Sequence, residues 1–294
     1  NNFGQLGDGT PVNKHVPVQV SGLTGVTAIS AGDYHSLAVK GDGTAWAWGR
    51  NDHGQLGDDD APIDKLTPVM ISYDWDFGAI SAGYLHSLAL RNDGTVWAWG
   101  RNYEGQLGDG TMYNERHVPV MVSGLTGVTA ISAHGGYHSL ALRIDTTVWA
   151  WGMNYGGALG DGTRDNKDTP VKVSGLTGVT AISVGGAFHS LAVKGDGTAW
   201  AWGLNDNGEC GDGTRTMRLA PVQVHVLGVH TTAAVTFYQI GVDTDFTGTV
   251  LTIDGTINLG VSDLPKTFTW NIGSTHTYAY ASPLDTGLGK QYVL

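Results

Sequence analysis

The chain has 294 residues, 41% of them apolar, which is enough to build a packed core and argues against disorder. Its formal net charge of -11, with only 16 lysines and arginines, disfavours nucleic acid as a partner because a polyanion would be repelled. Cys210 is the only cysteine, so neither an intramolecular disulfide nor a thiolate metal cluster is expected, and no apolar run approaches the roughly 20 residues that span a bilayer.

A repeat runs through most of the chain. The sequence Trp-Ala-Trp-Gly recurs at Trp46, Trp97, Trp149 and Trp200, at steps of 51, 52 and 51 residues. A histidine followed by serine keeps the same step. The repeated side chains are His35, His86, His138, His189, Trp46, Trp48, Trp97, Trp99, Trp149, Trp151, Trp200 and Trp202. A fixed period of this length indicates an array in which each unit buries its apolar face against its neighbours.

Each unit predicts four short strands and no helix. In the first unit we expect strands at residues 16–20, 26–31, 35–39 and 44–49, because short apolar runs alternate with glycine-rich turns. The last two strands are joined by an Asp-Gly turn at Asp42, which permits the positive φ of a tight hairpin. The third unit has Thr146 in place of that glycine, so its turn is expected to be looser or of another type.

Four strands in about 50 residues match one blade of a β-propeller. Because side chains alternate across a strand, the two tryptophans of each Trp-Ala-Trp point to one face, where we expect them to hold neighbouring blades together. The predicted units are residues 1–50, 51–101, 102–152 and 153–203, with a half unit at 204–227. Residues 1–20 and 204–224 carry the same half of the repeat and cannot complete each other, so we expect an incomplete arc of a larger propeller.

The repeat resembles the regulator of chromosome condensation family. The resemblance rests on Gly-x-x-His-Ser-Leu-Ala-Val/Leu, Asp-Gly-Thr-x-Trp-x-Trp-Gly and Asn-x-x-Gly-Gln-Leu-Gly, and covers residues 1 to about 227. It implies a propeller, usually of seven blades, in which each blade mixes strands from successive repeats. It does not extend to the tryptophans of the family's plant UV-B receptor, since the positions after the first glycine hold Asp33, Tyr84, Gly136 and Ala187.

The tail from residue 228 to 294 departs from the repeat. Residues 237–242, 249–253 and 268–270 are expected to form strands, with Asp254-Gly255 as a turn. This segment resembles small β-sandwich modules of bacterial cell-surface proteins. The sequence ends in an apolar run at Leu294, so we expect an incomplete module.

Two repeated features invite a chemical interpretation. Four histidines around a propeller axis could hold a metal, but equivalent sites on successive blades diverge, so we expect buried histidines bonded to the backbone of their own or the next blade. Each His-Ser pair could suggest hydrolysis, yet adjacent strand residues face opposite sides and no Gly-x-Ser-x-Gly motif is present. No catalytic, cofactor or metal site is predicted.

Loop carboxylates and one irregular loop are the remaining candidates. Asp58, Asp59, Asp60 and Asp64, and likewise Asp161, Asp165 and Asp168, could bind calcium, although neither set has the EF-hand pattern and solvated loops are the default expectation. In the second unit, Tyr73, Asp74, Trp75 and Asp76 stand where the other units have the loop sequence Gly-Leu-Thr-Gly. They could form a contact patch for a partner, because such aromatics dominate interface hot spots; alternatively, they simply fill space.

These observations favour a non-catalytic binding scaffold, extracellular and bacterial, that presents propeller loops to a protein or glycan, without a cofactor and without membrane insertion. Two alternatives remain. One is a guanine-nucleotide exchange factor, by family analogy alone. The other is a carbohydrate-active enzyme that uses loop carboxylates, for which no acid–base pair stands out.

Overall fold

The computed structural model describes residues 1–71, 76–186 and 188–224, together with the backbone of five strands beyond residue 231. The chain divides into two compact units, Asn1–His225 and Val226–Leu294. Within the described residues, no helix is long and apolar enough to cross a membrane.

The first unit consists of four antiparallel sheets, each of four strands in chain order. Blade 1 comprises β1 (Val26–Ala31), β2 (His35–Lys40), β3 (Ala45–Gly49) and β4 (Lys65–Met70). Blade 2 comprises β5 (Phe77–Ala82), β6 (His86–Arg91), β7 (Val96–Gly100) and β8 (Arg116–Met121). Blade 3 comprises β9 (Val128–Ser132), β10 (His138–Arg143), β11 (Val148–Gly152) and β12 (Lys167–Lys172). Blade 4 comprises β13 (Val179–Gly185), β14 (His189–Lys194), β15 (Ala199–Gly203) and β16 (Arg218–Gln223).

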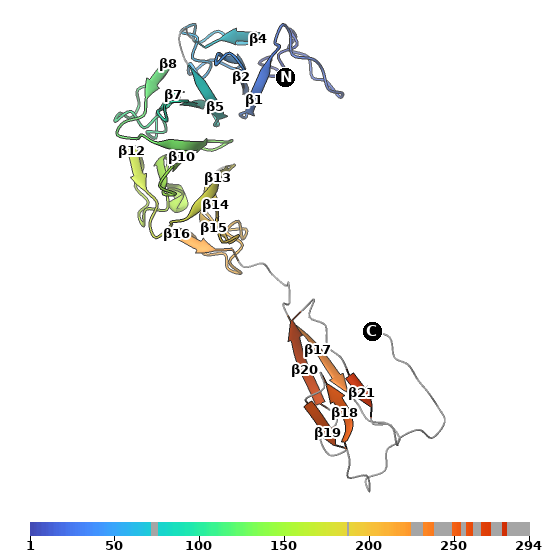
Figure 1. The fold of residues 1–294 in the computed structure, drawn as a ribbon. Coiled ribbons are helices and arrows are strands. Elements are labelled where there is room, and N and C mark those ends of the chain that lie inside the picture. The colour runs from blue at the N-terminus through green and yellow to red at the C-terminus, as the bar shows by residue number, and fades with distance from the viewer. Residues whose placement is uncertain are drawn as a thin grey trace. The chain divides into compact units, whose positions relative to one another are not determined.

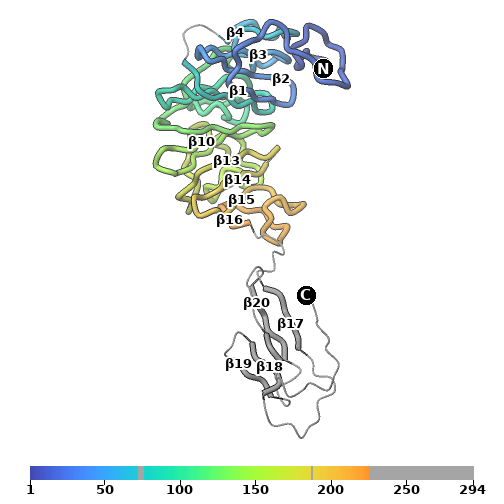
Figure 2. The backbone as a smooth tube through the Cα atoms, turned by 45° about the vertical axis from the view of Figure 1, so that its right-hand side comes forward, coloured from blue at the N-terminus to red at the C-terminus, as the bar shows by residue number. Residues whose placement is uncertain are grey.

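The blades form an arc that does not close into a ring (Figures 1 and 2). Strands β1, β5 and β13 lie along the inner side of the arc, and β4, β8, β12 and β16 lie along its outer rim (Figure 1). The inner strands of successive blades contact one another, as β1 contacts β5 and β5 contacts β9. The predicted all-β architecture, an incomplete propeller, is therefore confirmed.

Each sheet takes its outer strand from the following repeat. Strand β4 pairs with β3, with Trp46 opposite Met70 and Ala47 opposite Val69. This mixing of successive repeats is what the family resemblance implied. It also explains one wrong prediction: residues 16–20 are not a strand. Their counterparts pair with a Trp-x-Trp strand about 20 residues earlier, and residues 1–15 contain no strand.

The hydrophobic core lies between the blades. Leu37, Val39 and Ala47 of blade 1 pack in one buried cluster with Phe77 and Trp99 of blade 2. Equivalent clusters fill the spaces between blades 2 and 3 and between blades 3 and 4. Each blade is therefore stabilised by its neighbours rather than by a core of its own.

The hairpin turn of the third blade keeps the geometry of the others, so the prediction of a different turn is wrong. The N–H of Thr146 donates to the carbonyl of Arg143 at 2.9 Å, as the N–H of Gly43 donates to Lys40 at 3.0 Å. Thr146 adopts a φ of 64°, close to the 81° of Gly43. Pairing of the flanking strands thus forces a β-branched residue into the left-handed region, at a cost of order 1–3 kcal/mol.

One short 3-10 turn and five further strands complete the described elements. The 3-10 turn η1 spans Tyr155–Gly157. In the second unit the strands are β17 (Thr232–Phe237), β18 (Thr249–Ile253), β19 (Ile257–Gly260), β20 (Lys266–Asn271) and β21 (Tyr278–Tyr280).

The described strands of the second unit form two antiparallel sheets, β17–β20 and β19–β18–β21. The predicted strand at residues 249–253 is confirmed, and the one predicted at 268–270 lies inside β20. The strand expected at 237–242 overlaps β17 only at Phe237; residues 238–242 lie outside the described residues, as does the Asp254-Gly255 turn. Strands β19 and β21 were not anticipated.

Candidate functional site

Each repeated histidine of the first three blades contacts the serine of the next blade rather than its own neighbour in sequence. The Nε2 atom of His35 lies 2.9 Å from the Ser87 hydroxyl. The corresponding distances are 3.0 Å from His86 to Ser139 and 2.8 Å from His138 to Ser190. The expectation of a buried histidine that bonds to the next blade matches this geometry, except that its partner is a side chain.

The serine hydroxyl fixes the direction of this hydrogen bond. Ser87 donates its single proton to the carbonyl of Gln55 at 2.8 Å, so its oxygen accepts from an N–H at His35 Nε2. Burial lowers the pKa of His35 to about 4, and burial with nearby positive charge lowers that of His86 to about 3. The imidazole is therefore neutral and acts as a donor. Activation of a serine nucleophile would need the opposite polarity.

The histidines do not assemble a metal centre. Across the described parts of the chain, no three His, Cys, Asp or Glu side chains come together as metal ligands. The three fully buried imidazoles, those of His35, His86 and His138, are separated by the blade spacing and each bonds to a serine.

The two tryptophans of each Trp-x-Trp face the preceding blade but serve different partners. Trp99 is fully buried, and its indole N–H donates to the Gln55 carbonyl at 2.9 Å, beside the Ser87 hydroxyl. Trp97 is half-buried and donates to the Thr95 hydroxyl of its own hairpin at 3.2 Å. Trp48, Trp151 and Trp202 repeat the first pattern. Trp46, Trp149 and Trp200 repeat the second. The second indole of each pair therefore ties its blade to the loop that contains Gln5, Gln55, Gln106 or Ala158.

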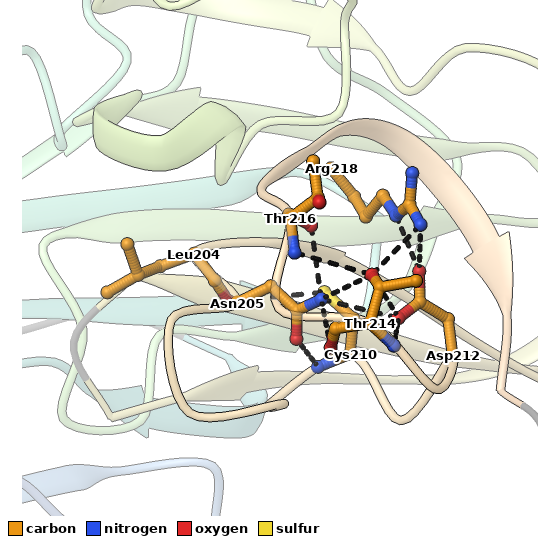
Figure 3. A network of polar contacts seen from close by, with 7 residues as sticks. All are labelled: Leu204, Asn205, Cys210, Asp212, Thr214, Thr216 and Arg218. Atoms are coloured by element: carbon orange, nitrogen blue, oxygen red, sulfur yellow. Dashed lines mark hydrogen bonds and ion pairs between the residues drawn. The ribbon is translucent and has the colours of Figure 1, made fainter.

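The loop after the third strand of each blade is held by a buried asparagine. In the fourth blade, the Asn205 side chain accepts from the N–H of Cys210 at 2.8 Å and donates to Asp212 and to the Thr214 and Thr216 carbonyls (Figure 3). Burial alone would raise the pKa of Asp212, but hydrogen bonds from Thr214 and Arg218, with the charge of Arg218, lower it to about 2. Asn51, Asn102 and Asn154 hold equivalent loops.

Four of the seven loop carboxylates considered as calcium ligands have cationic or amide partners. Asp58 and Asp60 both pair with Lys65, and Asp64 accepts from the N–H of Asn51 at 2.8 Å. Asp161 accepts from Thr163 and lies 3.7 Å from Lys167. Asp59, Asp165 and Asp168 do not join them in a ligand set. These loops are organised by their own side chains.

Three of the four residues of the irregular loop in the second unit, Tyr73, Asp74 and Trp75, lie outside the described residues. The fourth, Asp76, is exposed and accepts a hydrogen bond from the Asn92 side chain at 2.8 Å. The contact patch therefore stays a prediction.

A row of aromatic side chains crosses one face of the arc and was not predicted. It consists of Phe3, Tyr34, Tyr84, Tyr137 and Phe188, and we call it the aromatic row. Successive ring centroids are 5.6 Å, 5.8 Å, 4.7 Å and 5.8 Å apart. Tyr155 extends the row beside Phe188 at 5.1 Å. All five rings are half-buried, so each presents one edge or face to solvent.

The aromatic row lies where two loops of each blade meet. Tyr34, Tyr137 and Phe188 directly precede the repeated histidine, in the turn between the first two strands. The segment that follows the third strand is bonded to this turn, as in the hydrogen bond from the Arg50 N–H to the Tyr34 carbonyl at 3.0 Å. The row therefore follows the loop end of the blades. The signal was available in the sequence as an aromatic residue before three of the four histidines.

Two arginines cover part of the aromatic row. The Arg50 guanidinium lies 5.0 Å from the Phe3 ring centroid and 5.2 Å from that of Tyr34. Arg101 lies 5.4 Å from Tyr137. Both arginines also meet acids, Asp52 at 2.6 Å and Glu104 at 2.9 Å. This face thus combines aromatic surface, two arginines held in place and flanking carboxylates. These are the groups through which proteins bind partners.

The architecture defines an incomplete β-propeller whose blades repeat about every 51 residues. Residues 1–247 match the model of the RCC1-like domain, and the chain belongs to that family. The resemblance found in the sequence is therefore confirmed for the repeat.

Relatives share the repeat over most of this chain. The chain is 33% identical over 229 residues to the ultraviolet-B receptor UVR8 of Arabidopsis thaliana, covering 76% of this chain and 51% of the receptor. It is 32% identical over 219 residues to the human E3 ubiquitin-protein ligase HERC2, covering 72% of this chain and 4% of the ligase. The chain thus spans about half of the first relative and a small part of the second.

Solved structures show the same fold. Human WBSCR16 aligns with a TM-score of 0.67 and 24% identity, over 78% of this chain and 62% of that one. Prp20p of Saccharomyces cerevisiae, described with its binding to Gsp1p and histones, aligns with a TM-score of 0.63 and 22% identity, over 71% of this chain and 52% of that one.

Proposed function

We propose that this chain is a non-catalytic scaffold that binds a partner protein through the aromatic row and its two arginines. The observation that carries the proposal is the continuity of the row, in which neighbouring centroids are at most 5.8 Å apart from Phe3 to Phe188. Tyrosine and arginine are the residues that most often dominate protein interfaces. A row carried by four successive blades presents an extended surface rather than a pocket.

The absence of catalysis is part of this proposal. It is supported by the hydrogen bonds that the repeated serines and histidines already make. The serines donate to backbone carbonyls, and the buried imidazoles are neutral donors. Loop aspartates such as Asp212 are bound by threonine and arginine. None of these groups is poised to transfer a proton near neutral pH.

A binding experiment with paired variants tests the proposal. The double variant Tyr84→Ala and Tyr137→Ala removes the closest ring pair, at 4.7 Å, and should weaken capture of a specific protein by at least tenfold. The control is Ile144→Ala, an exposed residue in a hairpin turn. A partner protein that binds the double variant, the control and the native chain equally would contradict the proposal. So would a glycan that binds the native chain but does not bind the double variant.

We further propose an extracellular location in a bacterium. Support comes from the composition, which is acidic with a single cysteine, and from the all-β second unit that follows the arc. Labelling of intact producing cells with a membrane-impermeant amine reagent should modify this protein. Labelling that appears only after lysis would show that the protein lies inside the cell and would contradict this part of the proposal.

Nucleotide exchange on a small GTPase remains the second candidate, by analogy with the regulator of chromosome condensation family to which the repeat belongs. The measurement is release of a fluorescent guanine nucleotide from GTPases of the producing organism. A rate unchanged by a saturating amount of this chain would exclude this candidate and leave the scaffold proposal standing.

A further inference from the structure

The aromatic row already binds arginine side chains that belong to this chain. The Arg50 guanidinium stands over the rings of Phe3 and Tyr34, at 5.0 Å and 5.2 Å. The same guanidinium donates to the Asp52 carboxylate at 2.6 Å. A cation is attracted to the face of an aromatic ring, and a guanidinium forms strong hydrogen bonds to a carboxylate. Both attractions act here on one side chain.

Arg101 repeats this arrangement in blade 2. Its guanidinium lies 5.0 Å from the Tyr103 ring centroid and 5.4 Å from that of Tyr137. It donates to the Glu104 carboxylate at 2.9 Å. Two separate positions along the row thus combine a ring, a guanidinium and a carboxylate in the same way.

Tyr84, in the middle of the row, has no such arginine. Among the described residues, no lysine or arginine stands over its ring, since Arg50 lies over Tyr34 and Arg101 lies over Tyr137. The Tyr84 ring is half-buried and lies 5.8 Å from the Tyr34 ring, at an interplanar angle of 76°. Two rings that stand nearly at right angles form a corner with one ring on each side.

Asp33 supplies a carboxylate beside this corner. It directly precedes Tyr34 and is exposed, and no lysine or arginine in the described part of the chain pairs with it. Neighbouring atoms bury part of its side chain and raise the pKa of its carboxyl, and the charge of His134 offsets this effect only in part. The negative charge of Asp33 is therefore incompletely stabilised, so a cation placed next to it would be attracted.

The hydroxyls of the corner add further hydrogen-bonding groups. Tyr84 contributes most to raising the pKa of the Tyr34 hydroxyl, through its charge and a hydrogen bond, and burial and the charge of Asp33 add to the effect. The two hydroxyls and the carboxylate therefore lie close together. Gly135 of blade 3 reaches the same carboxylate without a side chain of its own, because a Cβ there would stand 3.4 Å from the Asp33 Oδ1 atom.

We propose that the corner formed by Asp33, Tyr34 and Tyr84, which we call the acidic corner, binds an arginine side chain of the partner protein. This inference rests on the proposed binding of a protein through the aromatic row, and it names the group of the partner that reaches the middle of the row. The guanidinium lies over the Tyr84 ring and donates to Asp33, as Arg50 does with Tyr34 and Asp52. The net charge of -11 favours the approach of a cationic surface.

Arginine fits the acidic corner better than lysine does. Its planar guanidinium carries five N–H donors, so it can stack on a ring and donate to a carboxylate and a hydroxyl at the same time. The ammonium of lysine is a compact point charge that cannot stack in this way. The acidic corner should therefore distinguish the two cations.

Three short peptides test the chemistry of the acidic corner. They are acetyl-Gly-X-Gly amides in which X is arginine, lysine or citrulline, the neutral analogue of arginine. Nuclear magnetic resonance of the full chain follows the Tyr84 ring and the Asp33 carboxyl during titration. The arginine peptide should bind about tenfold more tightly than the citrulline peptide, and more tightly than the lysine peptide. It should also lower the pKa of Asp33, because a nearby positive charge favours the carboxylate. Equal binding of the three peptides would overturn the proposal.

Two matched variants separate the acidic corner from the general charge of the chain. Asp33→Asn and Asp196→Asn each remove one exposed carboxylate, but Asp196 lies in a hairpin turn where it meets Lys194 at 3.9 Å. Asp33→Asn should weaken binding of the arginine peptide about tenfold, and Asp196→Asn should leave it unchanged. Equal losses would show unspecific attraction and would overturn the proposal. Circular dichroism checks that both variants are folded.

A partner protein that is lost in the double variant Tyr84→Ala and Tyr137→Ala allows this inference to be tested apart from the proposed function. Blocking the arginines of that partner with phenylglyoxal should weaken its binding about tenfold, whereas acetylating its lysines should have little effect. If the partner binds Asp33→Asn as tightly as the native chain, the proposed function stands and the arginine inference is wrong. If the arginine peptide binds as expected but no protein depends on Tyr84 and Tyr137, the proposed function is wrong instead.

Discussion

The imidazole of His35 and the hydroxyl of Ser87 lie 2.9 Å apart although 52 residues separate them in the sequence. The Ser87 hydroxyl donates a hydrogen bond to the Gln55 carbonyl, which also accepts one from Trp99. One backbone carbonyl thus accepts hydrogen bonds from a serine and an indole of the same blade. That serine in turn accepts a hydrogen bond from the imidazole of the blade before. This joint recurs at every contact between blades and explains why His, Ser, Trp and the loop glycines repeat in step.

The joint predicts a loss of stability in mild acid. Burial lowers the pKa of His35 to about 4 and those of His86 and His138 to about 3, so only the unfolded chain binds protons as the pH falls below about 6.5. Each histidine should cost about 2 kcal/mol of folding free energy between pH 7 and pH 5. Urea unfolding at the two pH values measures this loss.

The variant His86→Gln separates titration from packing. Its amide can still donate to Ser139 but does not titrate, so the variant should lose less stability than the native chain between pH 7 and pH 5. His15→Gln, at an exposed position, is the control. Equal losses in the native chain and His86→Gln would show that the buried imidazole does not govern the acid response.

A second prediction concerns the strained hairpin of blade 3. Thr146 has a φ of 64° where the equivalent residue in blade 1 is Gly43. Thr146→Gly should therefore raise the free energy of unfolding by about 1 kcal/mol, since the lost bond from the Gly178 N–H to the Thr146 hydroxyl is exposed and water can replace it. Thermal unfolding measures the gain.

The neighbouring substitution gives the opposite sign. Thr147→Gly removes a hydroxyl that donates to Asp145 at 2.6 Å and accepts from Trp149 at 3.2 Å, so it should destabilise the chain. If both glycine variants shift the melting temperature in the same direction, backbone strain at Thr146 is not the controlling effect.

The four-stranded blade could be predicted from the sequence because three independent signals agree. The Asp-Gly turn, the alternating Trp-x-Trp strand and the fixed period all indicate the same hairpin. Sequence reasoning missed two features that depend on neighbours. Residues 16–20 have strand-forming character but no strand beside them to pair with. Thr146 is a poor residue for a tight turn, yet its flanking strands are anchored by blades on both sides.

The aromatic row illustrates a second limit. Tyr84 stands one position earlier in its repeat than Tyr34 and Tyr137 do in theirs. In an alignment of repeats it is out of register, whereas in space its ring lies between the other two, at 5.8 Å and 4.7 Å. Residues at different positions of the repeat come together here through the arrangement of the blades in space. The period of the sequence does not predict that arrangement.

A third prediction distinguishes the two tryptophans of a blade. Trp99→Phe removes a buried indole and its hydrogen bond to Gln55, and should cost about 2–3 kcal/mol. Trp97→Phe affects a half-buried ring bonded to its own hairpin and should cost less than about 1 kcal/mol. Chemical denaturation of the two variants provides the comparison. Equal costs would mean that neither the deeper burial of Trp99 nor its bond to Gln55 adds to stability.

The last prediction concerns the single thiol. Cys210 is fully buried in the position that Leu56 and Leu107 occupy in other repeats. Burial raises the pKa of its thiol to about 11, and only the thiolate reacts. Modification by a disulfide reagent at about pH 8 should be at least ~100-fold slower in the native chain than in denaturant. Cys210→Leu should fold normally, because leucine fills the same space in the other blades. Rapid, complete modification of the native chain would instead mean that the loop around Asn205 opens readily and that its hydrogen bonds do not hold it closed.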